Sequence, residues 1–256
     1  MKALTLAFQD DPRFAELKKH RDEVGGIHHV WGMDRRITPL LMEALSDTKR
    51  FRLIVTYEER RAREIVEDYR FYSRQTFYYP AKDALFYSAD IHSNNTVQER
   101  LEIFKKIAEG RPCTVVTTIE GLMDKIPSIS HIIENILTIK VGDTLQLDTF
   151  SRKLTTLGYE KTSIVETPGQ FSVRGGIIDI FSLTEECPYR VELWGDDIDS
   201  IRSFDVESQR SMERVEEFVI YPSTEMVLDD VRISKGIAKL EKEHKAQAKL
   251  LKEQFH

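Results

Sequence analysis

The chain has 256 residues, of which 41% are hydrophobic and 31% are charged. These fractions are typical of a folded globular protein and exclude a disordered or fibrous one. The net charge of −6 gives the molecule as a whole no electrostatic footprint for a nucleic-acid backbone. No apolar run approaches the roughly 20 residues that a membrane-spanning helix needs, and the N-terminus lacks a signal-peptide pattern. We therefore expect a cytoplasmic protein with no membrane partner.

Residues 1–134 alternate between strand-like and helix-like segments. A short apolar run, Ile27–Trp31, comes first in the chain. The later strand-like segments are Phe51–Tyr57, Gln75–Pro80 and Cys113–Thr118, and the helical patterns are Ile37–Leu45, Glu58–Tyr72 and Val97–Ala108. This alternation predicts an α/β domain with a parallel sheet and helices on both faces.

Residues 135–219 have a different pattern, in which short strands are joined by turns. One helical segment, Asp148–Leu157, ends at Gly158. The candidate strands are Phe171–Leu183, Tyr189–Trp194 and Ile198–Phe204. We predict an inserted, smaller α+β domain that contains an antiparallel sheet. Residues 220–256 turn helical and highly charged, with a thin apolar stripe, and we expect them to return to the first domain as a truncated, solvated helix.

A phosphate-binding loop would belong at the junction VWGMDRRITPLLM, which contains Gly32. Such a loop needs a second glycine, a lysine for the phosphate oxygens and a serine or threonine for Mg²⁺. The corresponding positions here are Ile37, Thr38 and Pro39, so the lysine and the final hydroxyl are missing. We interpret the loop as degenerate and expect no nucleotide cofactor.

Other catalytic or metal-binding patterns are also missing. Cys113 and Cys187 are far apart and have no metal-ligand spacing to each other or to a histidine. His28 and His29 are adjacent, so on a strand they would point to opposite faces. We expect no metal site and no catalytic residues, which favours a binding module over an enzyme.

The strand Tyr189–Trp194 carries the most informative pattern. Because alternate residues share a face, Val191 and Leu193 form its apolar side. Arg190, Glu192 and Trp194 then project together from the other side, and arginine and tryptophan are enriched at interface hot spots. An equally weighted alternative is that Trp194 packs on a local helix while Arg190 and Glu192 pair across the sheet. Arg174 precedes Gly175 and Gly176, whose expected bulge or close backbone approach leaves its face undetermined.

The segment PGQFSVRGGIIDIFSLTEECPYRVELWGDDIDSIRSFDVESQRS closely resembles the signature region of the transcription-repair coupling factors (Mfd). It is also similar to the excinuclease component UvrB, and the resemblance extends more weakly through the first domain. It implies a degenerate, RecA-like or helicase-like first domain, interrupted by the inserted domain. The chain lacks room for the long DNA-gripping hairpin of UvrB, which favours the coupling factor.

The resemblance also implies a partner and the residues that bind it. In both families the inserted domain is similar to a docking site for the excinuclease component UvrA. By position, Arg174, Arg190 and Trp194 correspond to its binding residues, and Glu192 corresponds to an acidic residue implicated in UvrB. The coupling factors commonly have Phe where this chain has Trp194, a departure that should keep the aromatic contact.

Two functions therefore remain to be separated. The first is a non-catalytic module that recruits UvrA in transcription-coupled nucleotide excision repair. Its parent would be an ATP-dependent DNA translocase that binds RNA polymerase and DNA through other domains, and the chain would be a fragment or a truncated reading frame. The alternative is a DNA-binding or nucleotide-binding excision-repair protein similar to UvrB.

Overall fold

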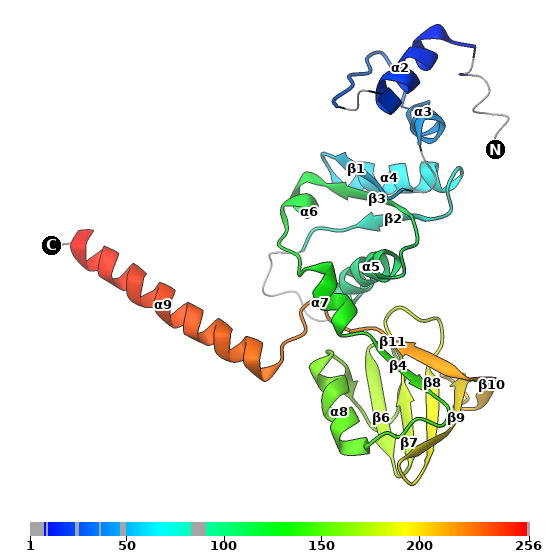
Figure 1. Ribbon diagram of the computed structural model, residues 1–256, viewed down its shortest axis with the longest axis vertical. Helices are drawn as coiled ribbons and strands as arrows, with labels where there is room; N and C mark the ends of the chain where they lie inside the picture. The colour runs from blue at the N-terminus through cyan, green and yellow to red at the C-terminus, as the bar shows by residue number, and fades with distance from the viewer. Residues whose placement is uncertain are drawn as a thin grey trace. The chain divides into compact units, whose positions relative to one another are not determined.

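The computed structural model describes residues 8, 10–23, 26–35, 37–46, 50–82 and 91–254, except for the side chains of 91–94 and 252–254. The chain divides into two compact units, residues 1–126 and 127–256. Helices and strands are labelled in Figure 1. None of the described helices is both long and apolar enough to cross a membrane.

The first unit contains a three-stranded parallel sheet of order β1-β3-β2, as the alternating pattern predicted. Its elements are α2 (Pro12–Glu23), α3 (Thr38–Leu45), β1 (Arg52–Thr56), α4 (Glu59–Arg70), β2 (Thr76–Tyr79), α5 (Ile91–Ala108), β3 (Thr114–Thr118) and α6 (Ile119–Met123).

Helices pack on both faces of this sheet. On one face, Ala62 and Val66 of α4 pack against Tyr78 and Val116. On the other, Tyr79 meets Phe104 of α5 edge to face, with ring centroids 6.1 Å apart. Adjacent tyrosines of β2 thus point to opposite helices, as strand geometry requires. The parallel sheet and its two-sided cover are confirmed.

The strand expected at Ile27–Trp31 is not formed, and that prediction was wrong. These residues have no regular secondary structure, and Ile27 and Trp31 are exposed. His28 and His29 interrupt the apolar run, which leaves too little continuous apolar surface for a buried strand. Helix α5 also begins at Ile91, six residues before the start predicted from its apolar spacing.

The second unit is built around a six-stranded sheet of order β10-β9-β8-β7-β6-β5. All its pairings are antiparallel except the short one between β5 and β6. The elements of this unit are α7 (Ile129–Glu134), β4 (Leu137–Lys140), α8 (Leu147–Thr156), β5 (Glu160–Lys161), β6 (Gln170–Arg174), β7 (Ile177–Ile180), β8 (Tyr189–Trp194), β9 (Asp197–Phe204), β10 (Ser211–Val215), β11 (Glu217–Ile220) and α9 (Asp230–Gln254).

The main hydrophobic core lies on one face of this sheet. Phe171, Ile178 and Val191 project from β6, β7 and β8 and are fully buried. They pack with α8, drawn beside the sheet in Figure 1, and with the antiparallel pair of β4 and β11. Leu154 is the buried anchor of α8. Alternate residues of these strands project from the opposite face of the sheet.

The predicted strand Phe171–Leu183 is in fact a hairpin. Strands β6 and β7 pair antiparallel, and Gly175 and Gly176 form the turn between them instead of a bulge. Gly175 has a φ of +60°, and a Cβ on Gly176 would lie 3.0 Å from the carbonyl oxygen of Leu193. Gly175 is favoured for its left-handed backbone conformation, and at Gly176 a side chain would be tightly packed against the backbone of β8.

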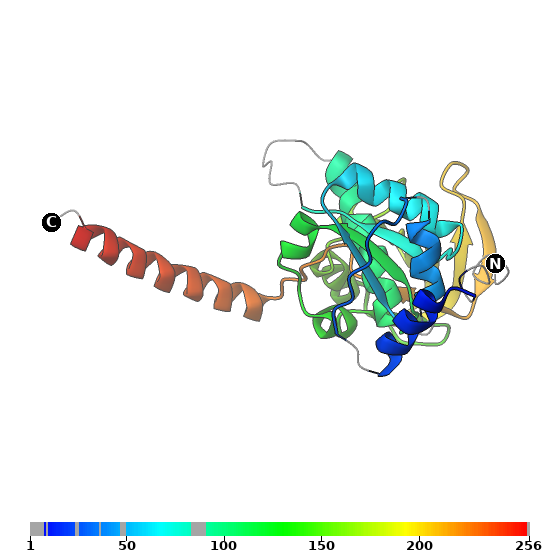
Figure 2. The ribbon, with the colours of Figure 1, turned by 90° about the horizontal axis from the view of Figure 1, so that it is seen from above.

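Helix α9 is one continuous helix in both views (Figure 1 and Figure 2). Its side chains are exposed over residues 230–251, except for the half-buried Ala248. The predicted solvated, charged helix is confirmed as a helix. Its assignment to the first domain stays a prediction.

Candidate partner-binding surface

Strand register places Arg174, Arg190 and Glu192 on the same face of the six-stranded sheet. Arg174 pairs with Ile177, which in turn pairs with Glu192. In the neighbouring row, Asp179 pairs with Arg190. Directly paired residues share a face, as do alternate residues of one strand. The sequence left the side of Arg174 undetermined, and the hairpin register assigns it to the polar face.

Trp194 belongs to the same side by strand alternation. The register of β8 and β9 shifts after Glu192, but the extra residue, Asp199, lies on β9. The alternation of β8 is therefore uninterrupted from Arg190 to Trp194. We use the term polar face for this side of β6, β7 and β8, which consists of Ser172, Arg174, Ile177, Asp179, Arg190, Glu192 and Trp194.

A buried carboxylate lies at the centre of the polar face. Asp179 is fully buried, and Arg190 donates to it from Nε to Oδ1 at 2.7 Å and from Nη2 to Oδ2 at 2.9 Å. Arg174 donates from Nη2 to the same Oδ2. Burying a carboxylate costs free energy unless the group is paired and hydrogen-bonded. Here two guanidinium groups provide both the opposite charge and the hydrogen bonds. The three side chains form one cluster across three strands.

Arg190 makes two further contacts that fix its position. Its guanidinium lies over the ring of Phe204, 4.7 Å from the centroid, and its Nη1 donates to the carbonyl oxygen of Gln209 at 3.2 Å. Gln209 has a φ of +58°, the one positive value among the described non-glycine residues. The hydrogen bonds to Asp179 raise the pKa of Arg190 above its already high ordinary value. The side chain of Arg190 is only 14% exposed.

The other three predicted residues differ in how freely they can contact a partner. The Arg174 side chain is 45% exposed. Glu192 is half-buried and accepts a hydrogen bond from the hydroxyl of Ser200 at 2.7 Å. Trp194 is 85% exposed. The alternative in which Trp194 packs on a local helix is therefore wrong, and Arg190 pairs across the sheet with Asp179 instead of Glu192.

Asp179, Phe204 and Gln209 were not expected from the sequence. The sequence does contain an indication of Asp179, because an aspartate between isoleucines in the strand IIDI implies a buried carboxylate that needs a cationic partner. The role of Gln209 depends on its left-handed backbone conformation, which no pattern in the sequence indicates.

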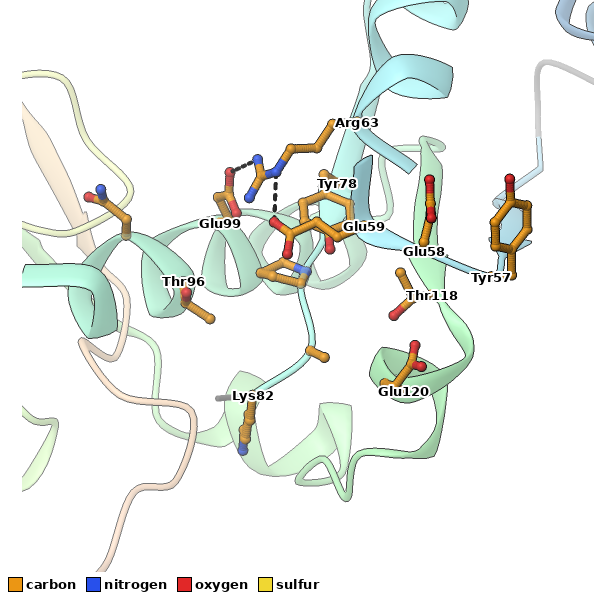
Figure 3. Close-up of a pocket in the computed structure, with 13 residues that line it drawn as sticks. Tyr57, Glu58, Glu59, Arg63, Tyr78, Lys82, Thr96, Glu99, Thr118 and Glu120 are labelled. Atoms are coloured by element: carbon orange, nitrogen blue, oxygen red, sulfur yellow. Dashed lines mark hydrogen bonds and ion pairs between the residues drawn. The ribbon is translucent and has the colours of Figure 1, made fainter. Parts of the chain in front are cut away.

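The first unit has a pocket where an α/β fold commonly binds a ligand, beyond the carboxyl ends of the parallel strands. It has a volume of about 680 Å³ and is lined by residues that follow β1, β2 and β3. Arg63 donates to Glu59 at 2.9 Å and to Glu99 at 3.2 Å, and it lies over the ring of Tyr78 (Figure 3). The charged lining residues are Glu58, Glu59, Glu99 and Glu120 against Arg63 and Lys82. This excess of carboxylates opposes the binding of a phosphate group.

The residues of the predicted degenerate phosphate loop, Gly32, Ile37, Thr38 and Pro39, are not among those that line this pocket. Gly32 has a φ of +73°, and α3 begins at Thr38 with Pro39 in its first turn. Ile37 stands at the N-cap without a side-chain hydrogen bond. No regular strand leads into Gly32 among the described residues 26–35, whereas a phosphate loop joins a strand to a helix. Within the described part of the chain, no group of three or more His, Cys, Asp or Glu residues could hold a metal ion.

Comparisons with known proteins found similar sequences. A family model described as the UvrB interaction domain matches residues 137–226. The chain is 30% identical over 236 residues to the transcription-repair-coupling factor of Staphylococcus aureus strain USA300 and 28% identical over 238 residues to that of Bacillus subtilis strain 168. These matches cover 91% and 90% of this chain but only 20% of each relative.

The matched residues include all the strands of the six-stranded sheet, so this segment is similar in sequence to UvrB interaction domains. Over nine-tenths of its length the chain is similar to transcription-repair coupling factors, and the resemblance seen in the sequence is confirmed. The chain spans about one fifth of the length of these relatives.

Proposed function

We propose that this chain is a non-catalytic interaction module of a transcription-repair coupling factor, and that its polar face binds the excinuclease component UvrA. The observation that carries the proposal is the exposure of Trp194 on the polar face of a UvrB interaction domain. A large aromatic side chain in this position loses solvent contact only when a partner covers it, and tryptophan is among the strongest hot-spot residues.

The four predicted residues would contribute to binding in different ways. Trp194 supplies apolar area, and Arg174 supplies a half-exposed guanidinium on the same face. Arg190 exposes only a small part of its side chain, and its main role is to neutralise the buried carboxylate of Asp179. Glu192 is held by Ser200 and adds a carboxylate between Arg190 and Trp194 along β8. A planar guanidinium and a rigid aromatic ring together give both directional and apolar contacts.

The acidic pocket of the first unit supports the non-catalytic part of the proposal. A nucleotide site needs backbone N–H groups and cations around its phosphates. The pocket at the strand ends offers glutamates instead, and Gly32 is followed by Ile37, Thr38 and Pro39 where a lysine and a hydroxyl would be needed. We propose that the first unit is a degenerate helicase-like domain that holds no nucleotide cofactor.

The wider role follows the relatives named above. We propose an inserted domain at 135–219, a first domain at 1–134 continued by 220–256, and a parent protein that acts in transcription-coupled repair. RNA polymerase and DNA would be bound by other parts of that parent.

Calorimetry with purified UvrA tests the proposal. The wild-type chain should bind, while Arg174→Ala and Trp194→Ala should each lose about 1–3 kcal/mol of binding free energy. An ATPase assay in the presence of DNA tests the alternative of a UvrB-like protein. Measurable turnover, or tight and salt-sensitive DNA binding by this chain, would contradict the non-catalytic module.

A further inference from the structure

We infer that Asp179 is a positioning residue of the UvrA docking surface, a role that rests on the proposed function above. Asp179 is fully buried and cannot itself touch a partner. Its carboxylate accepts hydrogen bonds from both Arg174 and Arg190, the two arginines of that surface. It therefore acts on binding through them.

The geometry makes Asp179 the hub of the cluster. It lies on β7, between Arg174 on β6 and Arg190 on β8. The two guanidinium groups are both donors and cannot hydrogen-bond to each other. Their shared acceptor is Oδ2 of Asp179, to which each donates from its Nη2. A substitution of either arginine should therefore alter the hydrogen bond that the other arginine makes to this oxygen.

Arg190 is the fixed member of the pair. Its guanidinium carbon lies over the ring of Phe204, and the carbonyl oxygen of Gln209 accepts a hydrogen bond from its Nη1. Gln209 is itself held, since its side-chain amide donates to the carbonyl oxygens of Val165 at 3.2 Å and Val206 at 2.8 Å. Two hydrogen bonds from this fixed guanidinium hold the carboxylate of Asp179, so the position of the carboxylate is fixed as well.

Arg174 is the member that Asp179 positions. It ends β6 directly before the Gly175–Gly176 turn, and its side chain is half-exposed. A free arginine on a turn would sample many rotamers and would lose that freedom on binding. Its hydrogen bond to Asp179 restricts the side chain before a partner arrives. The guanidinium of Arg174 therefore stays half-exposed, with its direction fixed, on the face that also carries Trp194.

The matched variants are Asp179→Asn and Asp148→Asn. Asp148 is an exposed carboxylate in the first turn of α8, a helix that packs on the opposite side of the sheet from the polar face. Asp179→Asn should weaken UvrA binding about tenfold, because it removes the negative charge and replaces one of the two acceptor oxygens by an NH2 group that cannot accept from an arginine. It should also speed solvent exchange of the Arg190 Nε–H proton in NMR spectra. Asp148→Asn should change neither.

A double-mutant cycle covers the case in which Asp179→Asn does not fold. Arg174→Ala and Arg190→Lys each keep a positively charged partner for Asp179. If Asp179 couples the arginines, their effects on UvrA affinity should depart from additivity by roughly fivefold or more. Additive effects would overturn the positioning role.

The remaining outcomes separate this inference from the proposed function. Binding to UvrA that survives Asp179→Asn unchanged, in a folded chain, would overturn the positioning role alone. Failure of the wild-type chain to bind UvrA would overturn the proposed function, and the positioning role with it.

Discussion

The guanidinium of Arg190 grips the buried carboxylate of Asp179 through two hydrogen bonds of 2.7 and 2.9 Å, while Trp194, four residues further along β8, is left 85% exposed. Residues that sequence alternation places in one outward row thus have different physical environments. One is part of the fold, and the other is free to contact a partner. Substitutions should separate the two roles.

Arg190→Ala should destabilise the second unit by about 2–4 kcal/mol, because it leaves the buried Asp179 with only the half-exposed Arg174 as a counter-ion. Urea denaturation followed by circular dichroism measures this. Arg214→Ala is the matched control, since Arg214 is exposed and makes one long hydrogen bond of 3.5 Å. Equal stability of the two variants would contradict a structural role for Arg190.

Trp194→Ala should leave the free energy of unfolding within about 0.5 kcal/mol of the wild type, because the side chain buries little area. The same variant should bind UvrA about 1–3 kcal/mol more weakly, whereas Trp194→Phe should keep most of the affinity. Met212→Ala, another exposed apolar residue of this unit, is the control. A large loss of stability in Trp194→Ala would show that the ring packs within the chain.

Gly158→Ala should cost more stability than Gly142→Ala. Both glycines have a φ of +90°, which strains an alanine by about 1–2 kcal/mol. A Cβ at Gly158 would also lie 2.8 Å from the side chain of Thr224, whereas one at Gly142 meets nothing within 4 Å. The clash should add about 1–3 kcal/mol. Thermal unfolding of the two variants measures the difference. A lower melting temperature for Gly142→Ala than for Gly158→Ala would contradict this expectation.

Alkaline pH should destabilise the first unit through Tyr69. Burial raises the pKa of Tyr69 to about 12, whereas an unfolded tyrosine titrates near pH 10. The unfolded chain therefore loses this proton first, so stability present below about pH 10 falls as the pH rises towards about 12. Chemical denaturation between these pH values should show a shallower decline for Tyr69→Phe. An identical decline in both proteins would contradict the raised pKa.

Strand alternation alone located much of the candidate surface. The bounds of β8 and the inward side of Val191 follow from one short segment, because a half-buried strand must alternate. Alternation could not place Arg174, since its face depends on whether Gly175 and Gly176 form a bulge or a turn. Only the register of the β6–β7 hairpin decides between them.

Other features depended on tertiary contacts that no local pattern encodes. The run Ile27–Trp31 has strand-like residues but no regular structure, so its apolar character was misleading. The burial of Arg190 arises from Asp179 on one neighbouring strand and Phe204 on the other. The contact from Gln209 comes from a residue 19 positions away, in a rare backbone conformation.

Fluorine NMR of a chain labelled with fluorotryptophan tests the central claim most directly. The chain has two tryptophans, Trp31 and Trp194, and both are 85% exposed, so one is an internal control for the other. On addition of unlabelled UvrA, the resonance of Trp194 should shift or broaden while that of Trp31 stays unchanged. A response of Trp31 alone, or of neither resonance when calorimetry detects binding, would contradict docking on the polar face.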